Sequence, residues 1–123
     1  MRTIRALMTL VLPLVSLLAA SASVAQHMNA PGNPCVHAGT GSDMTACFMR
    51  ASAAADKGLN AYYKRLLANL GSEDVKNLQA AQRLWIQFRD ANCAAEYDLY
   101  EGGSAGPTVR AACVEALTRN RAA

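Results

Sequence analysis

The pattern of apolar positions predicts three helices after an apolar leader. In the first helix, apolar or small residues recur at alternating steps of three and four, which keeps one helical face apolar. This series consists of Phe48, Ala51, Ala55, Leu59, Tyr62, Leu66 and Leu70. Ser42 or Asp43 can cap the start of the helix, and Gly71 ends it. Gly58 lies inside it, as a weak point or as a place where another backbone comes close.

A second helix is predicted from Ser72 to the Gly102-Gly103 pair. Its main apolar stripe contains Leu78, Ala81, Trp85, Phe88, Asn92, Ala95 and Leu99. A second stripe beside it contains Ile86, Cys93, Tyr97 and Tyr100. Two adjacent stripes predict a helix that is covered on two sides, and therefore the central element of the fold.

A third helix is predicted to begin around Pro107, with an inner face of Val109, Cys113, Ala116 and Leu117. Residues 26–42 are rich in proline, glycine and asparagine, which predicts an irregular arm. Short connections make neighbouring helices antiparallel. The predicted fold class is therefore all-α: a three-helix antiparallel bundle with an irregular, disulfide-tied N-terminal arm, in one domain spanning residues 26–123.

The first 25 residues have the layout of a signal peptide. Arg2 and Arg5 precede an apolar run over residues 6–20, and small residues follow up to Ala25. We predict cleavage after Ala25, with Ala22 as the alternative. The run is too short for a comfortable membrane span, which needs about 20 apolar residues. The first cysteine, Cys35, lies too far from the cleavage point to carry a lipid, so we expect a periplasmic or secreted protein with no stable membrane anchor.

Loss of the leader lowers the net charge from +3 to about +1, which argues against nucleic acid as a partner. The four cysteines, Cys35, Cys47, Cys93 and Cys113, favour two disulfides in an exported domain of this size. Zinc is the weaker alternative, because no C-x-x-C pair is present. Antiparallel packing allows Cys35–Cys47 with Cys93–Cys113, or Cys47–Cys93 with Cys35–Cys113.

Catalytic chemistry has little support in the sequence. A serine nucleophile needs an activating base, and the only histidines, His27 and His37, lie in the predicted arm. No glycine-rich phosphate loop, H-E-x-x-H motif or calcium loop is present. We therefore predict no enzyme activity, no catalytic residue, no metal site and no cofactor.

Polar residues within or beside the packing faces predict a network that sets the register of the helices. The predicted members are Asp56, Asn60, Arg83, Trp85, Arg89, Asp90 and Arg121. Matching levels across the antiparallel helices places Asp56 within reach of Arg83, and Arg121 near Trp85. It also places Asn60 within reach of Gln79 or Gln82. Trp85 is predicted to be a core residue, with partner contact as the alternative.

The most distinctive sequence block is Q-R-x-W-I-x-[FY]-R-D-x-x-C, which ends at Cys93. Together with the other cysteines, over residues 35–121, this block resembles the lysozyme inhibitor LprI-like N-terminal domain family, a set of bacterial exported helical domains. The resemblance implies the pairing Cys35–Cys47 with Cys93–Cys113. The chain departs from the named member in having no lipid-attachment cysteine, and from the usual family pattern in having Gly58 where a larger residue stands.

The resemblance implies an exported binding protein whose partner is a lysozyme-type glycosidase. Such enzymes cut sugar chains with two carboxyl groups in an open cleft. A protruding loop could occlude that cleft, and acidic residues (Glu96, Asp98 and Glu101) would steer it toward a basic enzyme. The predicted recognition loop consists of Tyr100, Glu101, Gly102, Gly103 and Ser104. The alternatives are a plain solvated turn and, for the whole protein, a non-inhibitory structural or envelope-interaction role.

Overall fold

The computed structural model describes residues 26–123 and contains helices joined by turns. A short 3-10 helix, η1 (Gln26–Asn29), is followed by α1 (Gly41–Leu67), α2 (Ser72–Asp98) and α3 (Gly106–Arg121). No strand occurs within this range, so the predicted all-α bundle is confirmed. The predicted signal peptide and both candidate cleavage points lie outside the described residues. Among the residues described, no helix is both long and apolar enough to cross a membrane.

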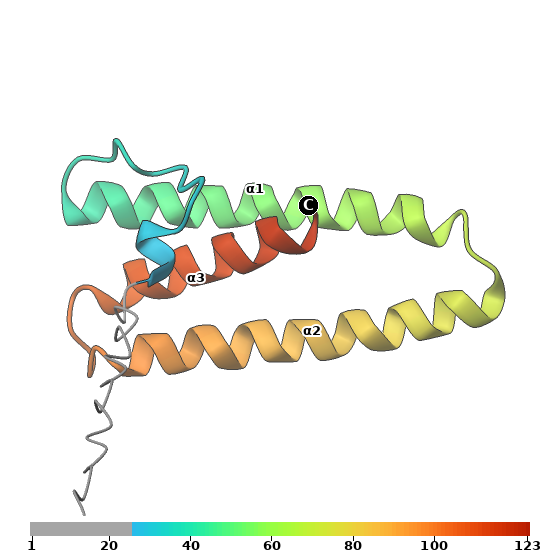
Figure 1. Cartoon of the computed structure of the whole chain (residues 1–123). Coiled ribbons are helices and arrows are strands. Elements are labelled where there is room, and N and C mark those ends of the chain that lie inside the picture. The colour runs from blue at the N-terminus through green and yellow to red at the C-terminus, as the bar shows by residue number, and fades with distance from the viewer. Residues whose placement is uncertain (1–25) are drawn as a thin grey trace, which may run out of the picture.

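Two long helices form an antiparallel hairpin, and the short third helix lies between them (Figure 1). α3 packs against α1, α2 and η1. Most of its residues on three sides are buried, including the predicted inner-face residues Val109, Cys113 and Ala116. α3 is therefore the central element, and the prediction that α2 is central was wrong. This helix of 16 residues fits between the two longer helices because the alanines and threonines on its buried faces allow close approach.

The main hydrophobic core lies where α1, α3 and the arm meet. Phe48, Cys35 and Ala112 are buried there, and the first of these is fully inaccessible to solvent. The partly buried residues packed around them are Met28, Ala38, Met44, Cys47, Ala51 and Ala111. This core joins the arm to the bundle.

The apolar stripes predicted for α2 do not face the core as expected. Phe88 and Leu99 from the main stripe are 57% and 60% exposed, and Ile86 from the second stripe is 39% exposed. The buried residues of α2 are Cys93 of the second stripe and, outside both stripes, the polar residues Gln82 and Glu96. Periodicity alone could not reveal this, because polar side chains can replace apolar ones in an interface when they find hydrogen-bonding partners.

The ends of the elements differ from the prediction by a few residues. α1 ends at Leu67, and a turn at residues 68–70 precedes Gly71. α2 ends at Asp98, before the glycine pair. The arm is not wholly irregular, because η1 forms at its start. A Cβ atom added to Gly58 would have nothing within 4 Å, so no other backbone approaches this glycine within the described chain.

Candidate functional site

The loop between α2 and α3, predicted as a recognition loop, has a backbone shape that depends on glycine. Glu101 and Gly102 both have positive φ angles, 46° and 75°. The Gly103 N–H donates to the Tyr100 carbonyl at 2.6 Å. A Cβ atom at Gly103 would lie 2.9 Å from that same carbonyl oxygen. Glycine therefore suits position 102, where φ is positive, and position 103, where a side chain would collide with the backbone.

The side chains of this loop face solvent. Glu101, Gly102, Gly103 and Ser104 are exposed, and Tyr100 is half-buried. The exposed carboxylate, hydroxyl and backbone groups of the loop can make hydrogen bonds with a partner, so the loop is suited to binding.

Fewer of the predicted acidic residues beside the loop are exposed than expected. Asp98 and Glu101 are exposed, but Glu96 is only 8% exposed. The Glu96 Oε1 lies 2.6 Å from the His27 Nδ1 and accepts a hydrogen bond from the Asn92 Nδ2 at 3.1 Å. Glu96 therefore helps to hold η1 against α2 and is not available to a partner of the loop.

His27, Glu96 and Cys113 lie close enough to suggest a metal site. Their potential ligand atoms all fall within 4.8 Å of one another. The Cys113 sulfur, however, is bonded to Cys93 and has no thiolate to offer. The two groups that remain do not make a closed metal site.

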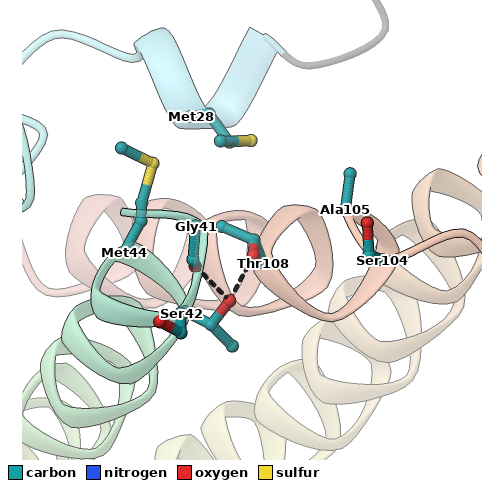
Figure 2. Close-up of a pocket in the computed structure, with 8 residues that line it drawn as sticks. Met28, Gly41, Ser42, Met44, Ser104, Ala105 and Thr108 are labelled. Atoms are coloured by element: carbon teal, nitrogen blue, oxygen red, sulfur yellow. Dashed lines mark hydrogen bonds between the residues drawn. The ribbon is translucent and has the colours of Figure 1, made fainter. Parts of the chain in front are cut away.

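Ser104, the last residue of the loop, borders an open pocket of about 530 Å³ (Figure 2). The start of α1, the start of α3 and Met28 of η1 form the other walls. Among the lining residues, the Thr45 hydroxyl donates to the Gly41 carbonyl at 2.8 Å and shares a hydrogen bond with the Thr108 hydroxyl. The loop therefore borders a pocket whose lining includes hydroxyl groups.

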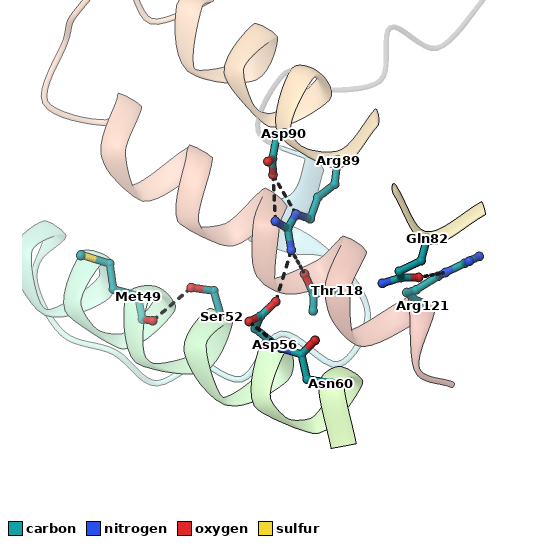
Figure 3. A network of polar contacts seen from close by, with 9 residues as sticks. All are labelled: Met49, Ser52, Asp56, Asn60, Gln82, Arg89, Asp90, Thr118 and Arg121. Atoms are coloured by element: carbon teal, nitrogen blue, oxygen red, sulfur yellow. Dashed lines mark hydrogen bonds and ion pairs between the residues drawn. The ribbon is translucent and has the colours of Figure 1, made fainter. Parts of the chain in front are cut away.

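Arg89 is the centre of the polar network inside the bundle (Figure 3). Its guanidinium lies 2.9 Å from the Asp90 carboxylate and 3.5 Å from that of Asp56. It also donates to the Thr118 hydroxyl at 3.3 Å. Trp85 lies between Arg89 and Arg121, whose guanidinium carbons are 5.3 and 5.6 Å from its ring. These contacts connect α1, α2 and α3.

Two of the predicted pairs in the network are replaced by others. Asp56 reaches Arg89 instead of Arg83, which is exposed and has no ion pair among the described residues. Asn60 donates to Asp56 on its own helix at 3.1 Å, and contacts neither Gln79 nor Gln82. Arg89 lies six positions beyond Arg83 along α2, and its long side chain reaches the Asp56 carboxylate.

Gln82, predicted as a possible partner of Asn60, instead accepts a hydrogen bond from the Arg121 Nε at 3.4 Å. Sequence reasoning missed Thr118, which is fully buried and accepts a hydrogen bond from Arg89. Thr118 directly follows Leu117, but it is not three or four residues from any residue of the predicted inner face, so periodicity gave no signal for it.

The two disulfides are Cys35–Cys47 and Cys93–Cys113, the pairing that the family resemblance implies. The first ties the arm to α1, and the second ties α2 to α3. Both lie at the end of the bundle that carries the recognition loop. The sequence positions alone left the alternative pairing open.

The family model for lysozyme inhibitor LprI matches residues 33–123 of this chain. An uncharacterised protein of Rhizobium meliloti is 30% identical to it over 76% of each chain. No solved structure matches. The chain belongs to the LprI lysozyme inhibitor family. Membership in an inhibitor family and two disulfides point to an exported protein with a protein partner.

Proposed function

We propose that this member of the LprI family is an exported inhibitor that binds a lysozyme-type glycosidase and occludes its cleft with the recognition loop, residues 100–104. The observation that carries the proposal is the exposure of residues 101–104 on a loop whose shape is fixed by its backbone. A loop held in one conformation loses little entropy on binding, which favours affinity.

The charges at this end support a basic partner. Asp98 and Glu101 are both exposed, and no basic side chain lies among residues 98–106. Opposite charge would speed association with a basic enzyme, and the effect would weaken as salt rises. Inhibition by occlusion requires no cofactor and no catalytic group on the inhibitor.

The test uses the chain purified after export and several types of lysozyme. Replacing Glu101 and Ser104 with alanine together should lower affinity by about 10- to 100-fold, because alanine replacement at a central contact costs about 1–3 kcal/mol. Inhibition of cell-wall lysis and direct binding are both measured, so that loss of affinity can be separated from loss of folding.

The matched control carries alanine at Ser72 and Glu73, an exposed serine and acid at the opposite end of α2. We expect it to inhibit like the unchanged chain. Equal inhibition by the loop variant and the control would rule out the loop. No inhibition of any lysozyme by the unchanged chain at high molar excess would instead favour a non-inhibitory envelope role.

A further inference from the structure

A cluster of potential metal ligands lies where η1, α2 and α3 meet. The ligand atoms of His27, Glu96 and Cys113 all lie within 4.8 Å of one another. Cys93 is bonded to Cys113 and brings a second sulfur next to them. Glu96 and both cysteines are buried, and His27 is half-buried. Three elements of the fold thus bring an imidazole, a carboxylate and two sulfurs together in a space largely closed to water.

Two atoms of this cluster are buried without a hydrogen-bonding partner among the described residues. They are the His27 Nδ1 and the Glu96 Oε2. The His27 Nδ1 lies 2.6 Å from the Glu96 Oε1, but this contact does not have the geometry of a hydrogen bond. Buried polar atoms normally have a partner, and an exception calls for an explanation such as a bound ion or a redox role. Both atoms can donate an electron pair to a metal ion.

Asn92 lies beside the cluster, where it can support such a site. Its Nδ2 donates to the Glu96 Oε1 at 3.1 Å and to the Cys113 sulfur at 3.5 Å. Hydrogen bonds from a neighbouring side chain orient the ligands of a metal and tune their basicity. The support for the ligands is therefore present in the folded chain, and the disulfide alone keeps the two sulfurs from acting as thiolates.

We propose that reduction of the Cys93–Cys113 disulfide converts this cluster into a zinc site. A dithiol reductant gives two electrons and two protons to the disulfide and is itself oxidised to a disulfide. Both cysteines are then thiols, and Zn²⁺ displaces their protons to the solvent as it binds. With His27 and Glu96 they supply four ligands, which is the number that zinc takes in closed structural sites. Thiolate and imidazole are ligands that suit zinc.

The disulfide and the zinc site are alternative ways to hold the same elements. The disulfide ties α2 to α3, whereas zinc joins η1 to both of them through His27. Metal binding stabilises the folded state, because the ligands are brought together only there. The reduced chain therefore keeps its loop end together through the metal. This inference does not depend on lysozyme inhibition.

The test compares zinc binding by the oxidised and the reduced chain. The full-length chain is expressed with its own leader, purified from the cell envelope, reduced with dithiothreitol in urea, and refolded without oxygen or reductant. The reduced chain should bind one Zn²⁺ with a dissociation constant below about 1 μM, measured against a competing chelator. The oxidised chain should not. Circular dichroism with and without zinc should show a higher melting temperature for the zinc-bound reduced chain, or helix formation on zinc addition if that chain does not fold alone.

Two pairs of variants of the reduced chain identify the ligands from η1 and α2. His27→Ala should weaken zinc binding at least about tenfold, because even the groups that support a ligand contribute about 10- to 100-fold. Its matched control is His37→Ala, which changes an exposed histidine of the same arm and should bind zinc like the unchanged chain. Glu96→Gln should also weaken binding, whereas Asp98→Asn, at an exposed carboxylate two residues away, should not.

A third variant shows which cysteines bind the metal. Replacing Cys93 and Cys113 with alanine should abolish submicromolar binding, and in the reduced chain this change removes no cross-link. With Co²⁺ as the probe, the thiolate-to-cobalt absorption should disappear as well. Equal binding by the oxidised chain, no submicromolar binding by the reduced chain, or equal affinities of His27→Ala and His37→Ala would overturn the proposal. So would unchanged binding after loss of Cys93 and Cys113, which would place the metal on Cys35 and Cys47.

Discussion

The two ends of the helical hairpin differ in what holds them together. At the loop end, where α2 meets α3, two disulfides and the core around Phe48 join four segments of the chain. At the hairpin end, where α1 turns into α2, the long helices extend beyond the C-terminus of α3 (Figure 1). A small cavity of about 80 Å³ lies there, lined by the buried Leu59 and Gln82 and by half-buried or exposed side chains, among them Arg121 at the end of α3.

The difference shows that the loop end is the more rigid end of this small protein. Few residues are available for a core, so cross-links and the largest buried side chain are concentrated at one end. That end also carries the recognition loop, and a loop on a rigid support keeps its shape. The hairpin end is expected to open locally at lower free-energy cost, because it buries less apolar surface.

The strongest test of this contrast compares one large side chain from each end. Phe48→Ala should lower the free energy of unfolding by about 3–5 kcal/mol, because it removes a fully buried ring. Leu66→Ala, at a half-buried position of the hairpin end, should cost about 1–1.5 kcal/mol. Urea unfolding followed by circular dichroism measures both, and equal losses would contradict the contrast.

A smaller effect is expected from the disulfide between α2 and α3. Replacing Cys93 and Cys113 with alanine should lower the free energy of unfolding by about 3 kcal/mol, since a loop of 20 residues is no longer closed in the unfolded chain. Amide hydrogen exchange should then speed up mainly in α3 and at the end of α2. Faster exchange confined to residues 60–80 would show that the hairpin end depends on this bridge as well.

The smallest expected effect concerns the start of α1 at the loop end. The hydroxyl and the backbone N–H of Thr40 both donate to the Asp43 carboxylate, at 2.8 and 3.0 Å. The hydroxyl bond first, and then the backbone bond, hold the pKa of Asp43 below its ordinary value of 3.8. A lowered pKa in the folded state stabilises the protein above pH 3.8, and this stabilisation is lost as the pH falls through the lowered value.

Asp43→Asn should therefore lower the melting temperature slightly at neutral pH, and the difference from the unchanged chain should vanish in strong acid. Thermal unfolding between about pH 2 and pH 7 measures this. Thr40→Val is the control, because it removes the hydroxyl bond and keeps the carboxylate. A difference that stays constant over the whole pH range would show that the ionised carboxylate does not stabilise α1.

The sequence by itself determined the number, order and approximate bounds of the three α-helices. Steps of three and four, capping residues and glycine stops act within a few residues, so they can be read without tertiary contacts. The short turn at Gly71 likewise required α1 and α2 to be antiparallel. The family resemblance implied the disulfide pairing, which spacing could not decide. The recognition loop was proposed from its glycines and the acidic residues beside them, and its role in binding stays a prediction.

Only the tertiary structure decided which faces of the helices are covered. The main stripe of α2 looked like a core face, but α3 packs against the side that carries Gln82 and Glu96, and Phe88 remains exposed. The tertiary structure likewise pairs Asp56 with Arg89 and not with Arg83. Periodicity states that a face is apolar, but the partner of that face depends on side chains distant in the sequence, which meet only when the whole chain folds.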